Sequence, residues 1–119
     1  MIRAINHVHV AIPPGREDTA RPFWRDLLGF TEAAKPASQA ARGGAWFEAG
    51  AVKVHLGVEQ DFRANDKAHV AFAVDDVGAL TERAHAAGYW VRDDDPLPGH
   101  VRAFLHDPFG NRIEILKPL

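Results

Sequence analysis

The sequence Asp107-Pro108-Phe109-Gly110-Asn111-Arg112-Ile113-Glu114-Ile115-Leu116 predicts a tight turn followed by a β-strand. In the turn, the proline fixes φ, and Gly110 or the asparagine after it accepts a positive φ. In the strand, Ile113 and Ile115 face one side while Glu114 and the preceding arginine face the other. A buried carboxylate is costly unless a cation or hydrogen-bond donors meet it. We therefore predict that Glu114 meets a metal ion.

The composition limits the classes of function. We expect 119 residues to form one domain, or two small halves that share a core, without a second catalytic domain. Lys and Arg total 14 and Asp and Glu total 16, for a formal net charge of −2, which disfavours a nucleic-acid partner. Without Cys, any metal must be bound by His, carboxylate or water. No apolar run approaches membrane-spanning length, so we expect a cytoplasmic protein with no membrane partner.

The first half of the chain predicts a strand, a helix and three further strands. Apolar residues alternate along the strands and recur at three- and four-residue spacing along the helix. Pro22 is tolerated in the first turn of that helix, and Gly29 ends it. The expected elements are a strand at 5–12, a helix at 20–28, a short strand and a loop within 31–44, and strands at 45–48 and 51–58.

The second half repeats this order after a polar linker at 59–67. Asp75 or Asp76 caps its helix, and Gly88 ends it. We expect one domain, 1–119, with module one at about 1–60 and module two at about 66–119. The expected elements are a strand at 68–74, a helix with an apolar stripe of Val77, Leu80, Ala84 and Ala87, a strand at 89–91, a loop at 93–99, and strands at 101–106 and 112–116.

Ligand-type side chains recur at matching places in the two halves. The spacing from His7 to His69 nearly equals the spacing from His55 to Glu114 and from Gly29 to Gly88. In each half, one polar side chain projects from the first strand and one from the last, on the face away from the helix. If the halves pack about an approximate two-fold axis, His7, His55, His69 and Glu114 converge.

Four stretches together resemble the vicinal oxygen chelate superfamily of glyoxalases, extradiol dioxygenases and fosfomycin and bleomycin resistance proteins. The resemblance implies an α+β fold, in which two tandem βαβββ modules form a cup-shaped mixed β-sheet with helices on the outer face. It also implies a homodimer, in which the ligands could come from one chain or from two. The four stretches are Asn6-His7-Val8, residues 23–30 (FWRDLLGF), residues 69–76 (HVAFAVDD) and residues 107–114 (DPFGNRIE).

The same resemblance implies one divalent metal ion that binds the substrate oxygens directly. His7, His69 and Glu114 stand where the family's His, His and Glu ligands stand. His55 stands where several members place a fourth ligand, although a hydrogen bond to a metal ligand, or a place in the pocket wall, would explain it equally well. Two imidazoles and one carboxylate leave open coordination positions and accept Fe, Mn, Ni, Co or Zn.

Other residues are candidates for the substrate pocket. His9 shares a face with His7 and could act as a general base beside the catalytic Glu114. Arg102 and Lys53 could bind an anionic group of the substrate, although solvated or paired cations are the ordinary alternative. Aromatic residues in strands are usually core, yet two of them could line the pocket. The full candidate pocket is His9, Trp46, Lys53, His55, Arg102 and Phe104.

These residues favour a metal-dependent enzyme that acts on a small oxygenated substrate. The subtype, whether lyase, isomerase, dioxygenase or thiol transferase, stays open. His55 replaces the carboxylate usual in glyoxalases, Phe104 replaces the tyrosine of fosfomycin-modifying relatives, and ring-cleaving dioxygenases are commonly longer. The alternatives are a non-catalytic binding or sequestering protein of the bleomycin-resistance type, and a carrier or regulatory module with a vestigial site.

Overall fold

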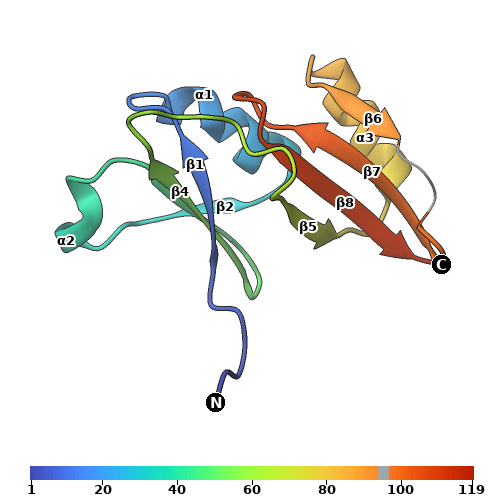
Figure 1. Cartoon of the computed structure of the whole chain (residues 1–119), viewed down its shortest axis with the longest axis horizontal. Helices are drawn as coiled ribbons and strands as arrows, with labels where there is room; N and C mark the ends of the chain where they lie inside the picture. Colours follow the sequence, from blue (N-terminus) through green and yellow to red (C-terminus); the bar gives the residue numbers. More distant parts are fainter. Residues whose placement is uncertain (94–96) are drawn as a thin grey trace. The chain divides into compact units, whose positions relative to one another are not determined.

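The computed structural model describes residues 1–93 and 97–119, so residues 94–96 of the expected loop at 93–99 lie outside the described residues. The chain divides into two units, Met1–Arg63 and Ala64–Leu119, and each is described by itself. Figure 1 shows the helices and strands of both units.

The first unit contains one four-stranded mixed sheet with strand order β1-β4-β3-β2. β1 pairs in parallel with β4, and the other neighbouring strands pair antiparallel. Gly50, with φ 59°, lies in the tight turn between the last two strands. The elements are β1 (Val8–Ile12), α1 (Glu17–Arg21), the π-helical η1 (Pro22–Leu27), β2 (Thr31–Ala33), α2 (Ala37–Ala40), β3 (Ala45–Ala49) and β4 (Val52–Val58).

The second unit repeats this topology, with strand order β5-β8-β7-β6. β5 pairs in parallel with β8, and the other neighbours pair antiparallel. The α+β class and the two tandem βαβββ modules are therefore confirmed. The elements are β5 (Val70–Ala73), α3 (Val77–Ala86), β6 (Val91–Asp93), β7 (His100–His106) and β8 (Arg112–Pro118).

Each sheet has one face that is packed into a hydrophobic core. In the first unit, Phe23 and Trp24 of η1 are fully buried together with strand residues such as Phe47. In the second unit, α3 packs on β6, β7 and β8, and Ile113 and Ile115 are buried at 1% and 0% exposure. β8 is not half-buried as expected, because Ile113, Glu114 and Ile115 are all buried. Successive strand residues still point to opposite faces, so Glu114 projects from the sheet face opposite the isoleucines.

The turn before β8 is closed by side-chain hydrogen bonds. Oδ1 of Asp107 accepts hydrogen bonds from the backbone N–H groups of Phe109 and Asn111, at 2.9 and 2.8 Å. Gly110 takes the positive φ, 91°, that the turn needs. The Asn111 side chain donates to Asp107 Oδ2 at 2.8 Å and accepts from the backbone N–H of Asn65 at 2.9 Å. This turn therefore anchors the chain segment that precedes β5 as well as the start of β8.

Three local expectations about the first unit are corrected. The helix begins at Glu17, so Pro22 lies beyond its first turn, where the missing N–H coincides with the change to π-helical pairing in η1. The loop expected within 31–44 contains the short helix α2. The strand expected from residue 5 begins at Val8, where the pairing with β4 starts, and residues 5–7 before it are exposed.

Two expectations about the second unit also change. The strand expected at 68–74 is shorter, so His69 lies immediately before β5. Ala87, expected in the apolar stripe of the helix, is exposed beyond the end of α3, whereas Val77 and Ala84 are buried. Asp76 caps α3 by accepting a hydrogen bond from the N–H of Ala79 at 3.0 Å, as expected.

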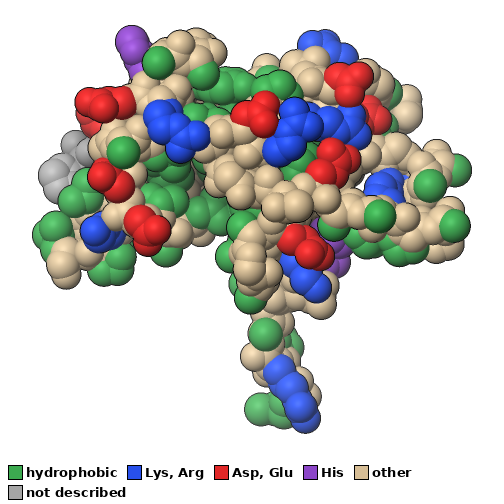
Figure 2. Space-filling view, turned by 180° about the vertical axis from the view of Figure 1, so that it is seen from behind, with side chains coloured by type: hydrophobic (Ala, Val, Ile, Leu, Met, Phe, Trp, Pro, Cys, Tyr) green, Lys and Arg blue, Asp and Glu red, His purple; other side chains and the backbone are tan. Residues whose placement is uncertain are grey.

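The surface carries charges of both signs. On the face shown in Figure 2, acidic and basic side chains are interspersed rather than gathered by sign. No helix among the described residues is long and apolar enough to cross a membrane. The expectation that nucleic acid is not a partner stays a prediction.

Candidate metal centre

His69 and Glu114 form a close pair in the second unit. The Nε2 atom of His69 lies 2.8 Å from Oε1 of Glu114, and the two residues are 45 positions apart in the sequence. Their side chains are 24% and 9% exposed. His69 immediately precedes β5, and Glu114 lies on β8, so the parallel pairing of these two strands brings the side chains together.

The other ring nitrogen of His69 fixes how the pair can interact. Nδ1 lies 2.9 Å from the backbone carbonyl oxygen of Lys67, which can only accept a hydrogen bond, so Nδ1 carries a proton. In a neutral imidazole, Nε2 then turns a lone pair toward the Glu114 carboxylate. These lone pairs repel each other unless a proton or a metal cation lies between them.

The donor atoms of this pair suit a divalent metal. Neighbouring ligand atoms that each lie about 2 Å from a metal in octahedral geometry are about 2.8 Å apart. The 2.8 Å between His69 and Glu114 matches that separation. The Lys67 carbonyl would orient the imidazole, as outer-shell partners of metal-bound histidines do. The residues present therefore fit a metal ion.

Cationic and aromatic side chains surround Glu114. Nη1 of Arg102 lies 3.8 Å from Glu114 Oε2. Phe104 is the cross-strand partner of Glu114, and its ring contacts the His69 ring edge-to-face at 5.6 Å between centroids. The guanidinium carbons of Arg102 and Arg112 lie 5.4 and 4.9 Å from the centre of the Phe104 ring. This face of the sheet therefore combines an aromatic floor with cations that can attract an anion.

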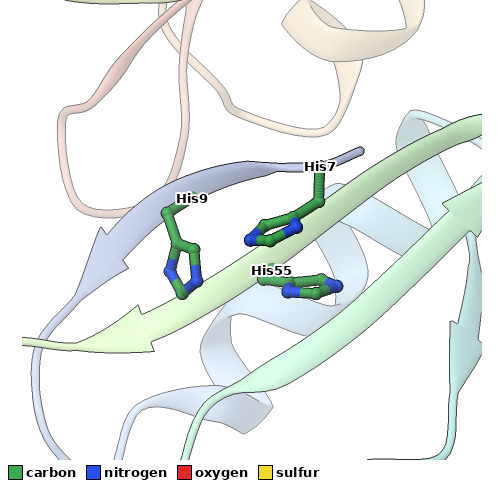
Figure 3. A group of neighbouring side chains, drawn as sticks. All are labelled: His7, His9 and His55. Carbon is green, nitrogen blue, oxygen red and sulfur yellow. The ribbon is translucent and has the colours of Figure 1, made fainter. Parts of the chain in front are cut away.

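Three histidines gather in the first unit. His7 immediately precedes β1, His9 lies on β1, and His55 is the register partner of His9 on β4. The rings of His7 and His55 stack at 4.1 Å between centroids, and His9 meets them edge-on at 5.2 and 5.6 Å. Figure 3 shows the three rings grouped on the same side of the two strands. One nitrogen from each ring lies within 4.8 Å of the others.

Two neighbours shape this histidine group. Trp46 on β3 is the cross-strand partner of His55, and their rings are parallel within 3° at 4.0 Å. Gly57 leaves space for His9, since a Cβ at that position would lie 2.9 Å from His9 Nδ1. His55 is therefore held between two rings, while the position of His9 depends on the missing side chain of Gly57.

Burial and mutual repulsion keep two of these histidines neutral. Desolvation lowers the pKa of His9, and the nearby His7 lowers it further. Desolvation also lowers the pKa of His55, helped by His7, His9 and Lys53 and opposed by Glu48. Neutral imidazole is the form that binds metals, so both rings are ready to act as ligands near neutral pH.

The sequence as a whole matches a family model described as the Glyoxalase/Bleomycin resistance protein/Dioxygenase superfamily, over residues 5–115. The chain belongs to this superfamily. The resemblance inferred from the sequence motifs is thereby confirmed. A glyoxalase family protein from Bacillus anthracis is 39% identical, with a TM-score of 0.94 over 100% of this chain and 98% of that one.

Two further solved structures, each less than 25% identical, share the fold. FosX, a fosfomycin resistance protein from Listeria monocytogenes, is 16% identical with a TM-score of 0.79, over 100% of this chain and 96% of its own. TnmS3, an antibiotic binding protein from Streptomyces sp. CB03234, is 23% identical with a TM-score of 0.70, over 99% and 100%. At these identities the likeness concerns the fold alone. No match is found among curated proteins.

The superfamily ligand positions inferred from the sequence fall in two groups. The structure places His69 and Glu114 in contact in the second unit, and His7 and His55 in contact in the first. Lys53 lies on the same sheet face as His55, and the Trp46 ring stacks on the His55 ring. The assignment of these residues as ligands and pocket residues stays a prediction.

Sequence reasoning missed several residues of these groups. Arg92 and Arg112 lie beside Phe104, but isolated arginines in strands give no signal in the sequence. The stack of His106 on Trp90, at 3.9 Å, was also missed, because the pairing of β6 with β7 decides it. Gly57 could have been noticed as a glycine inside a strand, which often marks a close approach.

The lowered pKa values predict that the stability of the metal-free protein depends on pH. A histidine whose folded pKa lies below the unfolded value of about 6.5 binds fewer protons in the folded state, so stability rises with pH in that window. His9, His55 and His106 all act in this direction, desolvation being the first cause for each. We expect the urea midpoint to be lower at about pH 5 than at about pH 7.5.

Histidine variants test whether these side chains cause the pH dependence of stability. His9→Asn and His55→Asn should each flatten the pH dependence, whereas replacement of the exposed His85 on α3 should leave it unchanged. Equal urea midpoints at the two pH values in the parent protein would contradict the prediction.

Proposed function

We propose that the protein is a divalent-metal-dependent enzyme that acts on a small oxygenated molecule, whose oxygen atoms chelate the metal directly. The observation that carries this proposal is the pair of His69 and Glu114, with Nε2 and Oε1 2.8 Å apart and the imidazole oriented by a backbone carbonyl. Membership of a superfamily that includes glyoxalases and dioxygenases supports it.

The bound metal would act as a Lewis acid that polarises a carbonyl, epoxide, enediolate or catecholate oxygen. His69 and Glu114 would hold it, and Glu114 could also accept or return a proton at its free carboxylate oxygen. The inference that His7 is a further ligand, and that His55 could be a fourth, comes from the family resemblance and is part of this proposal. His9 is the proposed general base, since its lowered pKa keeps it neutral and able to accept a proton.

Side chains around the metal ligands would select the substrate. Arg102 lies 3.8 Å from Glu114 and is half-buried, so it can bind an anionic group next to the reacting atoms. Phe104 is 3% exposed, so it would support the pocket by packing against His69 and Arg102. Lys53 and Trp46 are proposed to play the corresponding parts in the first unit. We therefore expect a substrate with adjacent oxygen atoms and a negative charge.

A metal-dependence experiment tests the proposal. Protein stripped with a chelator is supplied separately with Fe²⁺, Mn²⁺, Ni²⁺, Co²⁺ and Zn²⁺, dialysed, and measured by elemental analysis. Each sample is then assayed on a hemithioacetal, a catechol and an epoxide with a thiol. We expect bound metal and turnover of one substrate class that chelation abolishes and the same metal restores. Turnover that is unaffected by chelation would contradict the proposal.

The second candidate function is ligand binding without chemistry. The antibiotic binding protein TnmS3 has the same fold and matches the full length of the chain, which favours this alternative. It predicts tight binding of a small molecule by the chelator-treated protein and no metal-dependent turnover. The same five metal-loaded samples, tested for binding and for turnover, distinguish the two functions. A homodimer, expected from the family, stays a prediction that light scattering can check.

A further inference from the structure

Side chains that the proposed function leaves unused gather at the edge of the second sheet. Trp90 immediately precedes β6, the edge strand, and its ring stacks on the ring of His106 at the end of β7, at 3.9 Å between centroids and 19° between planes. The guanidinium carbon of Arg92 lies 5.5 Å from the centre of the Trp90 ring. We propose that Trp90, Arg92 and His106 form a subsite for an aromatic carboxylate, whose ring stacks on Trp90 and whose carboxylate pairs with Arg92.

Trp90 offers an aromatic surface to a ligand. It is 41% exposed, whereas Leu105, on the opposite face of the same sheet, is 0% exposed. The backbone N–H of His106 donates a hydrogen bond to the Trp90 carbonyl oxygen at 3.1 Å, so the two stacked side chains start from neighbouring backbone positions. The stack restrains the indole, and a planar ring can contact its exposed part without first ordering the side chain.

Arg92 supplies the positive charge on this face. Residues two apart on a strand share a face, so Arg92 lies on the same face as Trp90. Its cross-strand partner is Phe104, and the guanidinium carbon lies 5.7 Å from the centre of that ring. Asp93 pairs with the buried Ala103 and points to the opposite face. Because Arg92 is exposed, its guanidinium can turn to donate two parallel hydrogen bonds to a carboxylate.

The groups around His106 leave its ring neutral. Desolvation lowers the pKa of His106, Asp66 and Asp107 raise it, and Arg112 and Arg92 lower it. Arg112 also pairs with Asp66 at 2.9 Å. With a pKa below about 6.5, the imidazole is uncharged near pH 7. It therefore serves as an aromatic support behind the indole, and Arg92 is the cation assigned to the carboxylate.

The subsite lies two strands away from the proposed metal ligands of the second unit. Arg92, Phe104 and Glu114 form one row across β6, β7 and β8. Adjacent strands are about 4.8 Å apart, so the backbone positions of Arg92 and Glu114 are about 10 Å apart. A substrate that fills the subsite and also reaches a metal is thus an aromatic acid with its oxygen pair far from the carboxylate. This substrate class rests on the proposed function, whereas binding at the subsite needs no metal.

Binding of 2-naphthoate to the chelator-treated full chain tests the subsite. The chain has three tryptophans, and ¹⁵N–¹H spectra separate their indole N–H signals. We expect 2-naphthoate to shift the Trp90 signal to saturation and to leave that of Trp24, which is 0% exposed, in place. 2-Naphthamide keeps the rings without the charge and should bind at least about tenfold more weakly. No saturable shift at Trp90, or equal affinity for the two compounds, would overturn the proposal.

Arg92→Gln and Arg83→Gln are a matched pair of variants. Both remove a guanidinium from an exposed position of the second unit, but Arg83 lies on α3. We expect Arg92→Gln to weaken 2-naphthoate binding at least about tenfold and Arg83→Gln to leave it unchanged. Equal affinities in the two variants would overturn the assignment of Arg92.

The result is separable from the test of the proposed function. Metal-dependent turnover without a shift at Trp90 would contradict the subsite alone. A shift at Trp90 together with turnover that chelation does not affect would contradict the proposed function alone and support the subsite.

Discussion

Glu114→Gln is expected to lower the affinity for the proposed divalent metal by more than about a hundredfold while the protein stays folded. The substitution keeps the shape that packs against Phe104 but removes the negative charge and one strong oxygen donor. His69 and the proposed ligand His7 remain, yet neutral imidazoles do not replace the negative charge of the carboxylate. Elemental analysis after dialysis against a weak chelator measures the loss, and turnover should fall with metal content.

The choice of metal matters for this experiment, because Zn²⁺ binds imidazoles strongly and could stay on the histidines that remain in the variant. The measurement is therefore made with Mn²⁺ or Fe²⁺, which imidazoles hold less strongly than Zn²⁺. Glu82→Gln, at an exposed position of α3, is the matched change of carboxylate to amide. It should leave metal content and turnover unchanged. Full Mn²⁺ occupancy in Glu114→Gln would show that Glu114 is not a ligand.

Stability should change little, which separates this effect from unfolding. Glu114 is 7% exposed, and its partners are His69 Nε2 at 2.8 Å and the half-buried Arg102 at 3.8 Å. The glutamine amide can still contact Nε2, so we expect a loss of about 1 kcal/mol in the free energy of unfolding. Circular dichroism and a urea titration of the variant check that the fold is retained.

The repeated modules were predictable because local patterns specify them. Alternation places Ile113 and Ile115 on one face of β8, and Gly29 and Gly88 end the helices with φ of 80° and 87°. A comparison of the two halves then predicts that both have the same order of elements. Such signals depend on neighbouring residues, so a single sequence contains them.

The side-chain groups were less predictable because they depend on strand register. Alternation shows that His9 and His55 face away from their cores, but it does not show that they are directly paired across β1 and β4. In the second module, Ala71 corresponds to His9 and pairs with Glu114 across β5 and β8. Alternation does not show that pairing either. The sequence thus indicated ligand-type residues, whereas the parallel registers decide that His9 joins His7 and His55.

Removal of the Asn111 side chain should have the largest effect on stability. Asn111 is 2% exposed, and its side chain bonds both the Asp107 carboxylate and the backbone N–H of Asn65. Asn111→Ala leaves that N–H without its side-chain acceptor and removes a donor from a buried carboxylate. We expect a loss of about 3 kcal/mol in the free energy of unfolding, measured by urea titration. Asn65→Ala keeps its backbone N–H and should cost less than about 1 kcal/mol.

Asn111→Asp tests the same contact through its pH dependence. The new carboxylate keeps an acceptor for the Asn65 N–H but places a second negative charge beside Asp107. Desolvation already raises the pKa of Asp107, although its hydrogen bonds act in the opposite direction. Two adjacent carboxylates share one proton, so the pair binds protons more tightly in the folded state than in the unfolded chain. The stability of this variant relative to the parent should therefore recover as pH falls from about 7 toward about 4. A stability difference that does not change with pH would show that the Asp107–Asn111 contact does not support the turn.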